Sequence, residues 1–399
     1  MGEKHGSARP SGSLLRRTAA TVTATAALAV AALLTAIPAA SAAAADQDAV
    51  RRVSGEADGT QLATASRGAS LSADGRYVAY GVKGPRDGCP LSVSTCLFVK
   101  DLRTGRQTQV PGTKRLAGNP VLSADGRLVA FFTGDGDVRP YLYDRTTGDL
   151  TLLWPGPPPS PFDFGYDGVV NAISADGRQV LYTVTYSHPG EPTRTRLLER
   201  DLATGTDTVV VPEGTADFVS GGGLSADGRY VAYGLVRESA GYQGLFVKDL
   251  RTGAVRRVDT ARDGTPGDAD SSLVRLSDDG RRVVFNSRSA NLTPESPAGD
   301  QWHPYVRDLR TGRIEAFGSA GRTVSAADGT ARHVVLQEPD ALVLRDLRTG
   351  RQRAIAPQTA EATLGAVTRH GREVVFASSE LDLVPDDTNG VSDVFLVHS

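Results

Sequence analysis

The chain has 399 residues, with 44 lysines and arginines against 46 aspartates and glutamates. This near balance argues against a strongly basic nucleic-acid surface and against a disordered acidic tail. Hydrophobic residues make up 40% of the sequence, enough for a sizeable core, while 44 glycines and 22 prolines indicate many turns. The composition therefore favours a protein of many short strands.

The first 45 residues have the features of a secretory signal peptide. Basic residues up to Arg16 and Arg17 precede an uncharged, alanine-rich run from Thr18 to Ile37, and Ala40-Ser41-Ala42 supplies a small-x-small cleavage motif. The apolar run is nearly long enough to span a bilayer, so an uncleaved membrane anchor is the alternative. We expect a signal peptide at residues 1–45, export to the outside of the cell or to the cell envelope, and no membrane span after cleavage.

Residues 46–399 are built from an internal repeat, which decides the fold. The hexapeptide Leu71-Ser72-Ala73-Asp74-Gly75-Arg76 recurs with small changes, and the glycine of each Asp-Gly pair marks a turn. These glycines are Gly75, Gly126, Gly177, Gly228, Gly280 and Gly329, and Gly371 follows a histidine that replaces the aspartate. The period of about 50 residues is that of a repeat with four strands and their loops, so seven units fill the chain.

A second turn runs in step with the first. It has the sequence Asp101-Leu102-Arg103-Thr104-Gly105, with counterparts at Asp144, Asp201, Asp249, Asp308 and Asp346. Apolar segments such as 77–80 leave the first turn, and others such as 97–100 enter the second. Asp-Gly and Thr-Gly pairs form hairpin turns because glycine adopts positive φ without steric cost. Each unit is therefore predicted to contain four antiparallel strands.

Four-stranded sheets repeated around an axis form a β-propeller. The segment 49–53 is identical to 254–258, a predicted fourth strand, whereas the last unit stops after its third strand at residues 395–397. We therefore expect an all-β, seven-bladed propeller, residues 46–399, in which the N-terminal strand completes the last blade. This pairing would close the ring and remove an open sheet edge.

The two turns together resemble the WD40-like, PD40-type repeats of TolB-like propellers. The resemblance rests on the Ser-Ala-Asp-Gly-Arg and Asp-Leu-Arg-Thr-Gly motifs and covers essentially the whole of residues 46–399. It implies a bacterial propeller that binds a protein or another ligand. TolB-type propellers usually have six blades, so six is the alternative to the seven counted here.

The two cysteines of the chain, Cys89 and Cys96, lie close together in the first repeat. An even, close pair in a secreted protein predicts an intramolecular disulfide. The first repeat is longer than the closely similar fourth repeat between its second and third strands. The disulfide is therefore expected to pin an inserted loop.

Both kinds of tight turn fall on one face of the predicted propeller, the turn face. The connections from second to third strand and from blade to blade fall on the other, the variable-loop face. Binding sites are expected there because the turns are scaffold. Proline-stiffened aromatic loops make low-entropy contact surfaces, although packing over a blade seam also explains the loop 154–168. With two loop histidines, the candidate binding residues are Trp154, Phe162, Phe164, Tyr166, His188, Trp302 and His303.

The last loop gathers oxygen-bearing side chains at Asp386, Asp387, Asn389 and Asp393. Such groups could coordinate Ca²⁺, although a turn at Asn389-Gly390 also explains part of the pattern. The spacing does not match an EF-hand. No other cofactor or metal is expected.

Motifs of common enzymes are missing from the sequence. It contains no Gly-x-Ser-x-Gly, no P-loop, no His-Glu-x-x-His and no dinucleotide fingerprint. We therefore expect no catalytic residue and no enzyme, but a secreted, monomeric propeller that binds a protein or a cell-envelope glycan through the variable-loop face. The alternative is a polysaccharide lyase or glycosidase whose His, Arg and carboxylate side chains converge at the mouth of the channel.

Overall fold

The computed structural model describes residues 50–56, 58–85, 94–113, 116–155, 164–187, 193–237, 242–297 and 300–399. Within these ranges the chain forms strands and turns but no helix. The described part of the chain accordingly offers no helix of the length and apolarity that crossing a membrane requires.

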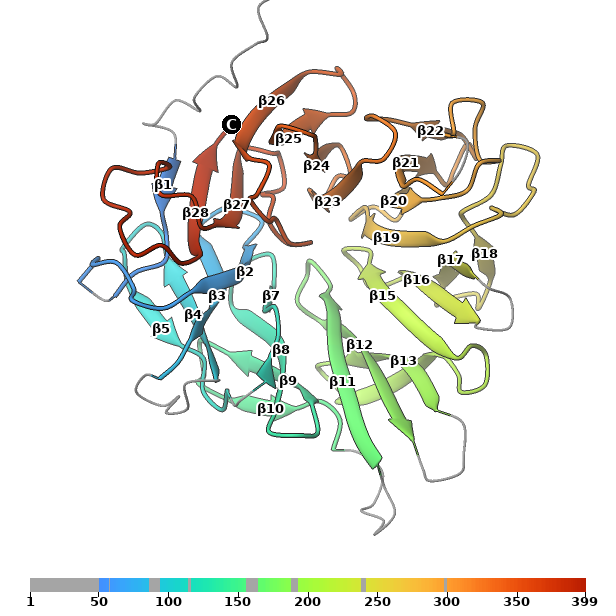
Figure 1. The fold of residues 1–399 in the computed structure, drawn as a ribbon. Coiled ribbons are helices and arrows are strands. Elements are labelled where there is room, and N and C mark those ends of the chain that lie inside the picture. The colour runs from blue at the N-terminus through green and yellow to red at the C-terminus, as the bar shows by residue number, and fades with distance from the viewer. Residues whose placement is uncertain are drawn as a thin grey trace, which may run out of the picture. The chain divides into compact units, whose positions relative to one another are not determined.

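The strands form seven sheets arranged around a central axis, so the predicted seven-bladed propeller is confirmed (Figure 1). Blade 1 contains β2 (Ser66–Leu71), β3 (Tyr77–Lys83), β4 (Thr95–Asp101) and β5 (Gln107–Gln109). Blade 2 contains β6 (Leu116–Ala117), β7 (Val121–Leu122), β8 (Leu128–Gly134), β9 (Arg139–Asp144) and β10 (Leu150–Leu152). Blade 3 contains β11 (Phe164–Ile173), β12 (Gln179–Ser187), β13 (Arg194–Asp201) and β14 (Thr206–Val211).

The remaining blades repeat the pattern from inner to outer strand. Blade 4 contains β15 (Phe218–Leu224), β16 (Tyr230–Arg237), β17 (Tyr242–Asp249) and β18 (Val255–Arg257). Blade 5 contains β19 (Ser271–Leu276), β20 (Arg282–Ser287), β21 (His303–Asp308) and β22 (Ile314–Ala316). Blade 6 contains β23 (Thr323–Ala327), β24 (His333–Gln337), β25 (Ala341–Asp346) and β26 (Gln352–Pro357). Blade 7 contains β27 (Glu373–Ser378), β28 (Asp393–His398) and β1 (Val50–Arg52), the N-terminal strand.

Ring closure follows the predicted scheme. Strand β1 pairs antiparallel with β28, with Val50 opposite Val397 and Arg52 opposite Phe395. In blade 4, Arg257 lies opposite Phe246 in the same register, so the identical segments 49–53 and 254–258 have the same structural role. The inner segment of blade 7 is not a continuous strand: it contacts β27 only through isolated bridges at Glu361 and Val367.

The inner strands share a bulge three to four residues before the first turn. Register shifts fall between Arg67 and Ser70, Val170 and Ala172, Ser220 and Gly222, Leu273 and Arg275, and Val324 and Ala326. A bulge inserts an extra residue, increases local twist and redirects side chains. The repeated position shows that the bulge belongs to the blade architecture.

The second strand of each blade is apolar on both faces because both faces pack against neighbouring sheets. Val78, Ala79 and Tyr80 of β3 are fully buried, and so are Val283, Val284 and Phe285 of β20. Residues of blades 6, 7 and 1 share one hydrophobic cluster, which extends from Val335 through Phe376 to Tyr80. The core is therefore a series of seams between blades.

At the seams, a side chain of one blade packs against a turn of the next blade. The first residue of the second strand packs on the positive-φ glycine in the first turn of the following blade. A Cβ added to Gly126 would lie 2.3 Å from the ring of Tyr77, and one added to Gly280 would lie 2.5 Å from the ring of Tyr230. Similar approaches join Gln179 to Gly228, His333 to Gly371 and Glu373 to Gly75. We call these approaches the seam contacts.

Blade 6 departs from the predicted turn register. Gly329 was expected at the positive-φ position, but that position belongs to Ala331, whose φ is 51°. The N–H of Ala331 donates to the Asp328 carbonyl, as the N–H of Gly280 donates to that of Ser277 in blade 5. Asp328 therefore replaces the usual serine, and its buried carboxylate bonds His333 Nδ1 at 2.7 Å. An Asp-Gly pair two residues early caused the wrong assignment.

Two glycine-to-alanine changes separate backbone strain from the seam contact. Gly126 and Gly105 have φ values of 69° and 75°, so each alanine incurs a similar left-handed penalty of about 1–2 kcal/mol. Nothing lies within 4 Å of a Cβ at Gly105, whereas one at Gly126 meets Tyr77. We expect Gly126→Ala to lower the free energy of unfolding by a further ~1–3 kcal/mol. Equal losses of unfolding free energy in the two variants, measured by denaturant unfolding, would contradict the seam contact.

Deleting residues 46–54 tests closure by β1. The deletion removes Val50 and Val53, which are 7% and 1% exposed, and burial of each valine stabilises the fold by about 1.5–3 kcal/mol. It also exposes the edge of β28 and takes Ser54 Oγ from Asp393 Oδ1, 2.6 Å away. Calorimetry should show a cooperative loss of stability relative to residues 46–399. Unchanged melting would mean that β1 does not hold the ring closed.

Candidate functional site

At the seam between blades 5 and 6, the two residues at the positions of the seam contact differ from those at the other seams. The first residue of β20 is the exposed Arg282, and the facing turn carries Ala331 instead of glycine. The guanidinium of Arg282 has no hydrogen-bond or ion-pair partner among the described residues. This seam borders a groove of about 1040 Å³ along the outer side of blade 5.

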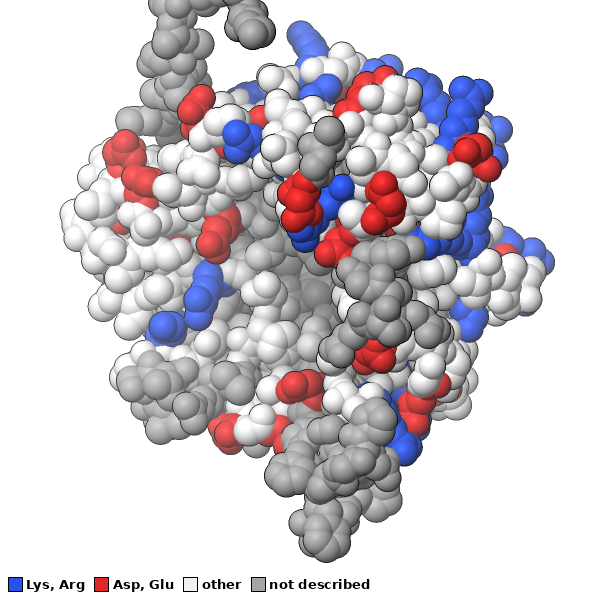
Figure 2. Space-filling model, turned by 45° about the vertical axis from the view of Figure 1, so that its right-hand side comes forward, with Lys and Arg blue, Asp and Glu red and all other residues white. Residues whose placement is uncertain are grey.

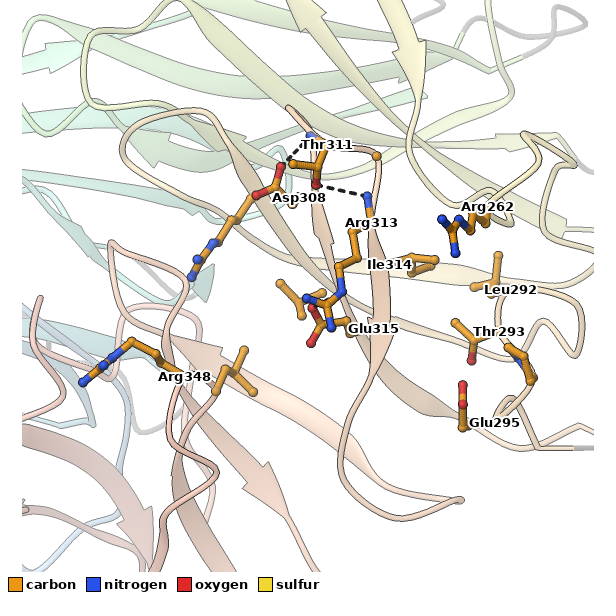
Figure 3. Close-up of a pocket in the computed structure, with 15 residues that line it drawn as sticks. Arg262, Leu292, Thr293, Glu295, Asp308, Thr311, Arg313, Ile314, Glu315 and Arg348 are labelled. Atoms are coloured by element: carbon orange, nitrogen blue, oxygen red, sulfur yellow. Dashed lines mark hydrogen bonds and ion pairs between the residues drawn. The ribbon is translucent and has the colours of Figure 1, made fainter.

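Side chains from six segments line this groove, the blade-5 groove, and they include Arg282 of β20 and Val306 and Asp308 of β21 (Figure 3). Arg262 comes from the connection between β18 and β19, Leu292 to Glu295 from the loop between β20 and β21, Arg313 to Glu315 from the turn into β22, and Leu347 and Arg348 from the turn after β25. The wall is apolar at Leu292, Val306, Ile314 and Leu347. The groove thus combines an apolar wall with several guanidinium groups.

The two turns of a blade are normally tied together by an ion pair. The arginine of the first turn reaches the aspartate of the second in blades 1, 2, 4 and 6: Arg76–Asp101 at 2.8 Å, Arg127–Asp144 at 2.5 Å, Arg229–Asp249 at 2.7 Å and Arg332–Asp346 at 2.5 Å. In blade 5, Arg281 instead lies 3.9 Å from Asp279. Asp308 accepts hydrogen bonds from the N–H groups of Arg310 and Thr311.

These ion pairs strongly lower the pKa values of the aspartate carboxyls. The Arg76 guanidinium hydrogen-bonded to Asp101 lowers the pKa of that carboxyl to about 2. Arg229 lowers the pKa of Asp249 to about 2 in the same way, and Arg332 holds the pKa of Asp346 far below its ordinary value. The repeated Arg and Asp of the two motifs are therefore structural partners.

A smaller pocket of about 430 Å³ lies at the seam between blades 7 and 1, on the turn face. It is lined by Asp74, Thr368, His370, Arg372, Glu373 and His398, with Ala73. His398 takes the place of the second-turn aspartate and lies 3.4 Å from Glu373 through its Nδ1. Burial raises the pKa of Glu373, so this pocket holds a carboxyl that gains protons more readily than usual.

The four residues proposed for calcium lie in the loop between β27 and β28. Asp386 Oδ2 pairs with Arg52 at 2.7 Å, and Asn389 Nδ2 donates to Asp393 Oδ2 at 3.0 Å. Gln61 Nε2 donates to Asp387 Oδ1 at 2.6 Å and to Asp393 Oδ2 at 3.0 Å. Amide N–H groups therefore occupy the space between the carboxylates, where a Ca²⁺ ion would require oxygens.

Calcium binding at this loop stays a prediction. The described residues contain no group of three or more His, Cys, Asp or Glu arranged for a metal ion. The hydrogen bonds instead attach the N-terminal segment at Ser54 and Gln61 to the last loop. We call this network the closure clasp.

Of the predicted binding residues, the structure describes the side chains of Trp154, Trp302 and His303. Trp154 lies after β10, half-buried, with its ring 6.1 Å from that of Tyr186. Phe164 and Tyr166 belong to the start of β11 but their side chains are not described, and Phe162 and His188 lie outside the described residues. Trp302 and His303 belong to blade 5, on another part of the ring.

Trp302 and His303 face different surroundings. The Arg288 guanidinium lies over the Trp302 ring at 5.7 Å. His303 is 6% exposed, and its ring lies 5.4 Å from that of Tyr305. Burial lowers the pKa of His303, and its Nδ1 has no partner among the described residues. His303 is therefore a core side chain and cannot contact a large partner.

Cys96 is fully buried in β4. Cys89 lies outside the described residues, so its pairing with Cys96 stays a prediction.

The described connections of the variable-loop face contain more acidic than basic residues, although Asp259 and Asp387 are buried and arginines at strand ends pair with Glu213, Asp259 and Asp386. The basic residues among them are Arg262, Arg288 and Arg322. The acidic ones are Glu56, Asp58, Asp135, Asp137, Glu213, Asp217, Asp259, Asp263, Asp268, Asp270, Glu295, Asp300, Glu338, Asp340, Glu361, Glu380, Asp382, Asp386 and Asp387. In the view of Figure 2, acidic side chains lie around the central hollow together with a few basic ones. A whole-chain net charge of −2 conceals this asymmetry.

Comparison with known proteins identifies the fold but no close relative. No family profile and no curated protein matches the sequence. An oligogalacturonate lyase in complex with manganese is similar in structure, at TM-score 0.60 and 15% identity, over 88% of this chain and 92% of that chain. The propeller domain of the Trilobed protease from Pyrococcus furiosus follows at TM-score 0.54 and 14% identity, over 84% and 95%.

TolB from Acinetobacter baumannii is a weaker match, at TM-score 0.45 and 16% identity, over 83% of this chain and 65% of that chain. The fold is a β-propeller of seven sheets, as the repeats predicted. The two better matches correct one expectation. Missing enzyme motifs led us to expect no enzyme, but the lyase and the protease domain show that enzymes use this fold. The inference failed because those motifs belong to other folds.

Sequence reasoning also missed two features that the structure brings together. The charge asymmetry could have been found by counting charges only in the long connections. The seam beside the blade-5 groove has Arg282 at the first position of the second strand and Ala331 at the glycine position of the next first turn. Both residues depart from the repeat in the sequence, but the wrong assignment of the first turn in blade 6 obscured the departure at Ala331.

The Arg76–Asp101 pair predicts a specific acid sensitivity. The folded-state pKa of Asp101 is about 2, below its ordinary 3.8, so the pair's contribution to stability is complete above about pH 4 and is lost as the pH falls towards 2. Asp101→Asn should lower the melting temperature at pH 7 and flatten its fall between pH 4 and 2. The control is Asp149→Asn on the exposed end of blade 2. An unchanged acid limb in Asp101→Asn would contradict the assignment.

Proposed function

We propose that this chain is a secreted binding propeller whose variable-loop face recognises a protein partner rich in lysine and arginine. The observation that carries the proposal is the excess of acidic over basic residues in the described connections of that face. A surface of one sign attracts partners of the opposite sign, speeds encounter and repels competitors of like charge. Secretion is supported by the signal-peptide features of residues 1–45.

The acidic loops rest on rigid supports, which favours binding with little loss of conformational entropy. Glu213 is held by Arg196 and by the hydroxyl of Tyr186, whose ring packs against Trp154. Asp386 is held by Arg52, and Asp387 by Gln61. The acidic side chains near blades 3 and 7 are thus positioned by contacts within the propeller.

The charge of this face also distinguishes partners. Oligogalacturonate, named with the similar lyase, is a polyanion, and an acidic face would repel it. A lyase or glycosidase site at the channel mouth would need several His, Arg or carboxylate groups that converge there. The described residues supply no observation that favours such a site over partner binding. A basic protein segment fits the observed charge better than an acidic glycan.

Peptide binding with charge-reversed variants tests the proposal. Residues 46–399 should bind a lysine-rich peptide and not a glutamate-rich peptide of equal length, with affinity that falls as salt rises. Glu338→Lys with Asp340→Lys, in the β24–β25 turn of the variable-loop face, should weaken binding at least tenfold. Surface plasmon resonance at 20 mM and 200 mM salt, about a threefold change in screening length, measures both effects.

The matched control carries the same change of charge away from that face: Asp149→Lys with Glu315→Lys, on the outer parts of blades 2 and 5. Near-normal binding by this control localises the interaction to the variable-loop face. Equal losses in both pairs, or no preference for the basic peptide, would overturn the proposal.

A further inference from the structure

The blade-5 groove runs along the outer side of blade 5, from two connections of the variable-loop face to the second turn of blade 6, and several arginines line it. Arg262, Arg282 and Arg348 line it, and none of their guanidinium groups has a hydrogen-bond or ion-pair partner among the described residues. Elsewhere on the turn face, arginines such as Arg76 and Arg332 are bound to aspartates. Among the three, Arg282 departs from the repeat, whereas Arg348 occupies the same second-turn position as Arg103 and Arg251, which are exposed and unpaired among the described residues as well.

Three acidic side chains also line the groove. Asp308, opposite Arg282 in the β20–β21 register, accepts the N–H groups of Arg310 and Thr311, and Glu315 pairs with Arg313 at 2.9 Å. Glu295 lies with Leu292 and Thr293, away from Arg348 (Figure 3). On the side of the groove toward blade 6, the guanidinium groups of Arg282 and Arg348 have no ion-pair partner among the described residues.

The origin of the groove explains why Arg282 is available. In blades 1 and 4 this position holds Tyr77 and Tyr230, whose rings cover the glycine of the next blade. The corresponding residue of blade 6, Ala331, already carries a Cβ, and it is fully buried. Arg282 is exposed instead of filling the seam, and it lines the groove with Arg348 of the next blade.

We propose that the blade-5 groove binds an anionic ligand that carries at least two carboxylate or phosphate groups on a compact body. Guanidinium groups bind both kinds of anion through paired N–H donors. The apolar wall at Leu292, Val306, Ile314 and Leu347 provides contact for the ligand body. A volume near 1040 Å³ suits a small-molecule ligand or a short acidic segment.

Calorimetric titration of residues 46–399 with two probes tests the proposal and identifies the anion. Citrate represents the carboxylates and pyrophosphate the phosphates, and acetate is the monovalent control. We expect citrate or pyrophosphate to bind at least tenfold more tightly than acetate in a low-salt buffer. Binding of only one polyanion supports the proposal and assigns the anion class. Binding of neither, or equal binding of acetate, overturns it.

Variants localise the binding. Arg282→Gln with Arg348→Gln should reduce affinity for the bound probe at least tenfold, because both arginines line the groove. The control, Arg103→Gln with Arg251→Gln, removes the same charge from exposed second turns of blades 1 and 4 and should bind normally. Equal loss in both pairs indicates general charge attraction and overturns the proposal. Arg348→Gln alone, on an exposed turn, gives the same test if the first pair folds poorly.

Discussion

The approach of one blade to the next depends on a residue without a side chain at one backbone position. In six of the seven first turns this position is a glycine with φ between 66° and 75°. Its role is both conformational and steric, because a Cβ at Gly75, Gly126, Gly228, Gly280 or Gly371 would meet a side chain of the preceding blade at 2.6 Å or less. The Asp-Gly-Arg sequence therefore satisfies three requirements together. Aspartate holds the turn, glycine admits the neighbouring blade, and arginine reaches the aspartate of the second turn.

A ring of such contacts is stable only if its ends are joined. Strand β1 supplies the missing edge of blade 7, and the closure clasp reinforces it with buried polar groups. Asp393 is fully buried and accepts hydrogen bonds from Ser54, Gln61 and Asn389. Buried carboxylates are tolerated when such donors surround them. In blade 4 the equivalent of Ser54 is Asp259, which accepts the N–H of Leu245 just as Ser54 accepts that of Val394. Closure therefore uses the ordinary contacts of a blade, made between distant parts of the chain.

The architecture could be predicted because it depends on local chemistry that repeats. The turns, the strand count, the number of blades and the closing strand all follow from short motifs and from one identical pentapeptide. The register of blade 6 could not, since Asp328-Gly329 imitates the turn pair while Ala331, an improbable residue for positive φ, occupies the turn position. The candidate binding residues were chosen from sequence position and residue type alone. His303 is next to a loop in sequence, yet cross-strand packing buries it. Loop aromatics were chosen by residue type, whereas the charge of the face is a property of many connections together.

The distribution of charge follows from the different constraints on the two faces. On the turn face, the first-turn arginines of blades 1, 2, 4 and 6 pair with the second-turn aspartates, so these charges occur in nearly fixed positions and compensate each other. The long connections carry no such requirement, and their acidic excess is free of the repeat. At the blade-5 groove, the exposed Arg282 stands where blades 1 and 4 have Tyr77 and Tyr230, and the next blade carries Ala331 where the other first turns have glycine, a position at which a ring placed as in Tyr77 would meet a Cβ. Two linked departures at one seam, with unpaired guanidinium groups beside an apolar wall, are better explained by a ligand than by the stability of the ring.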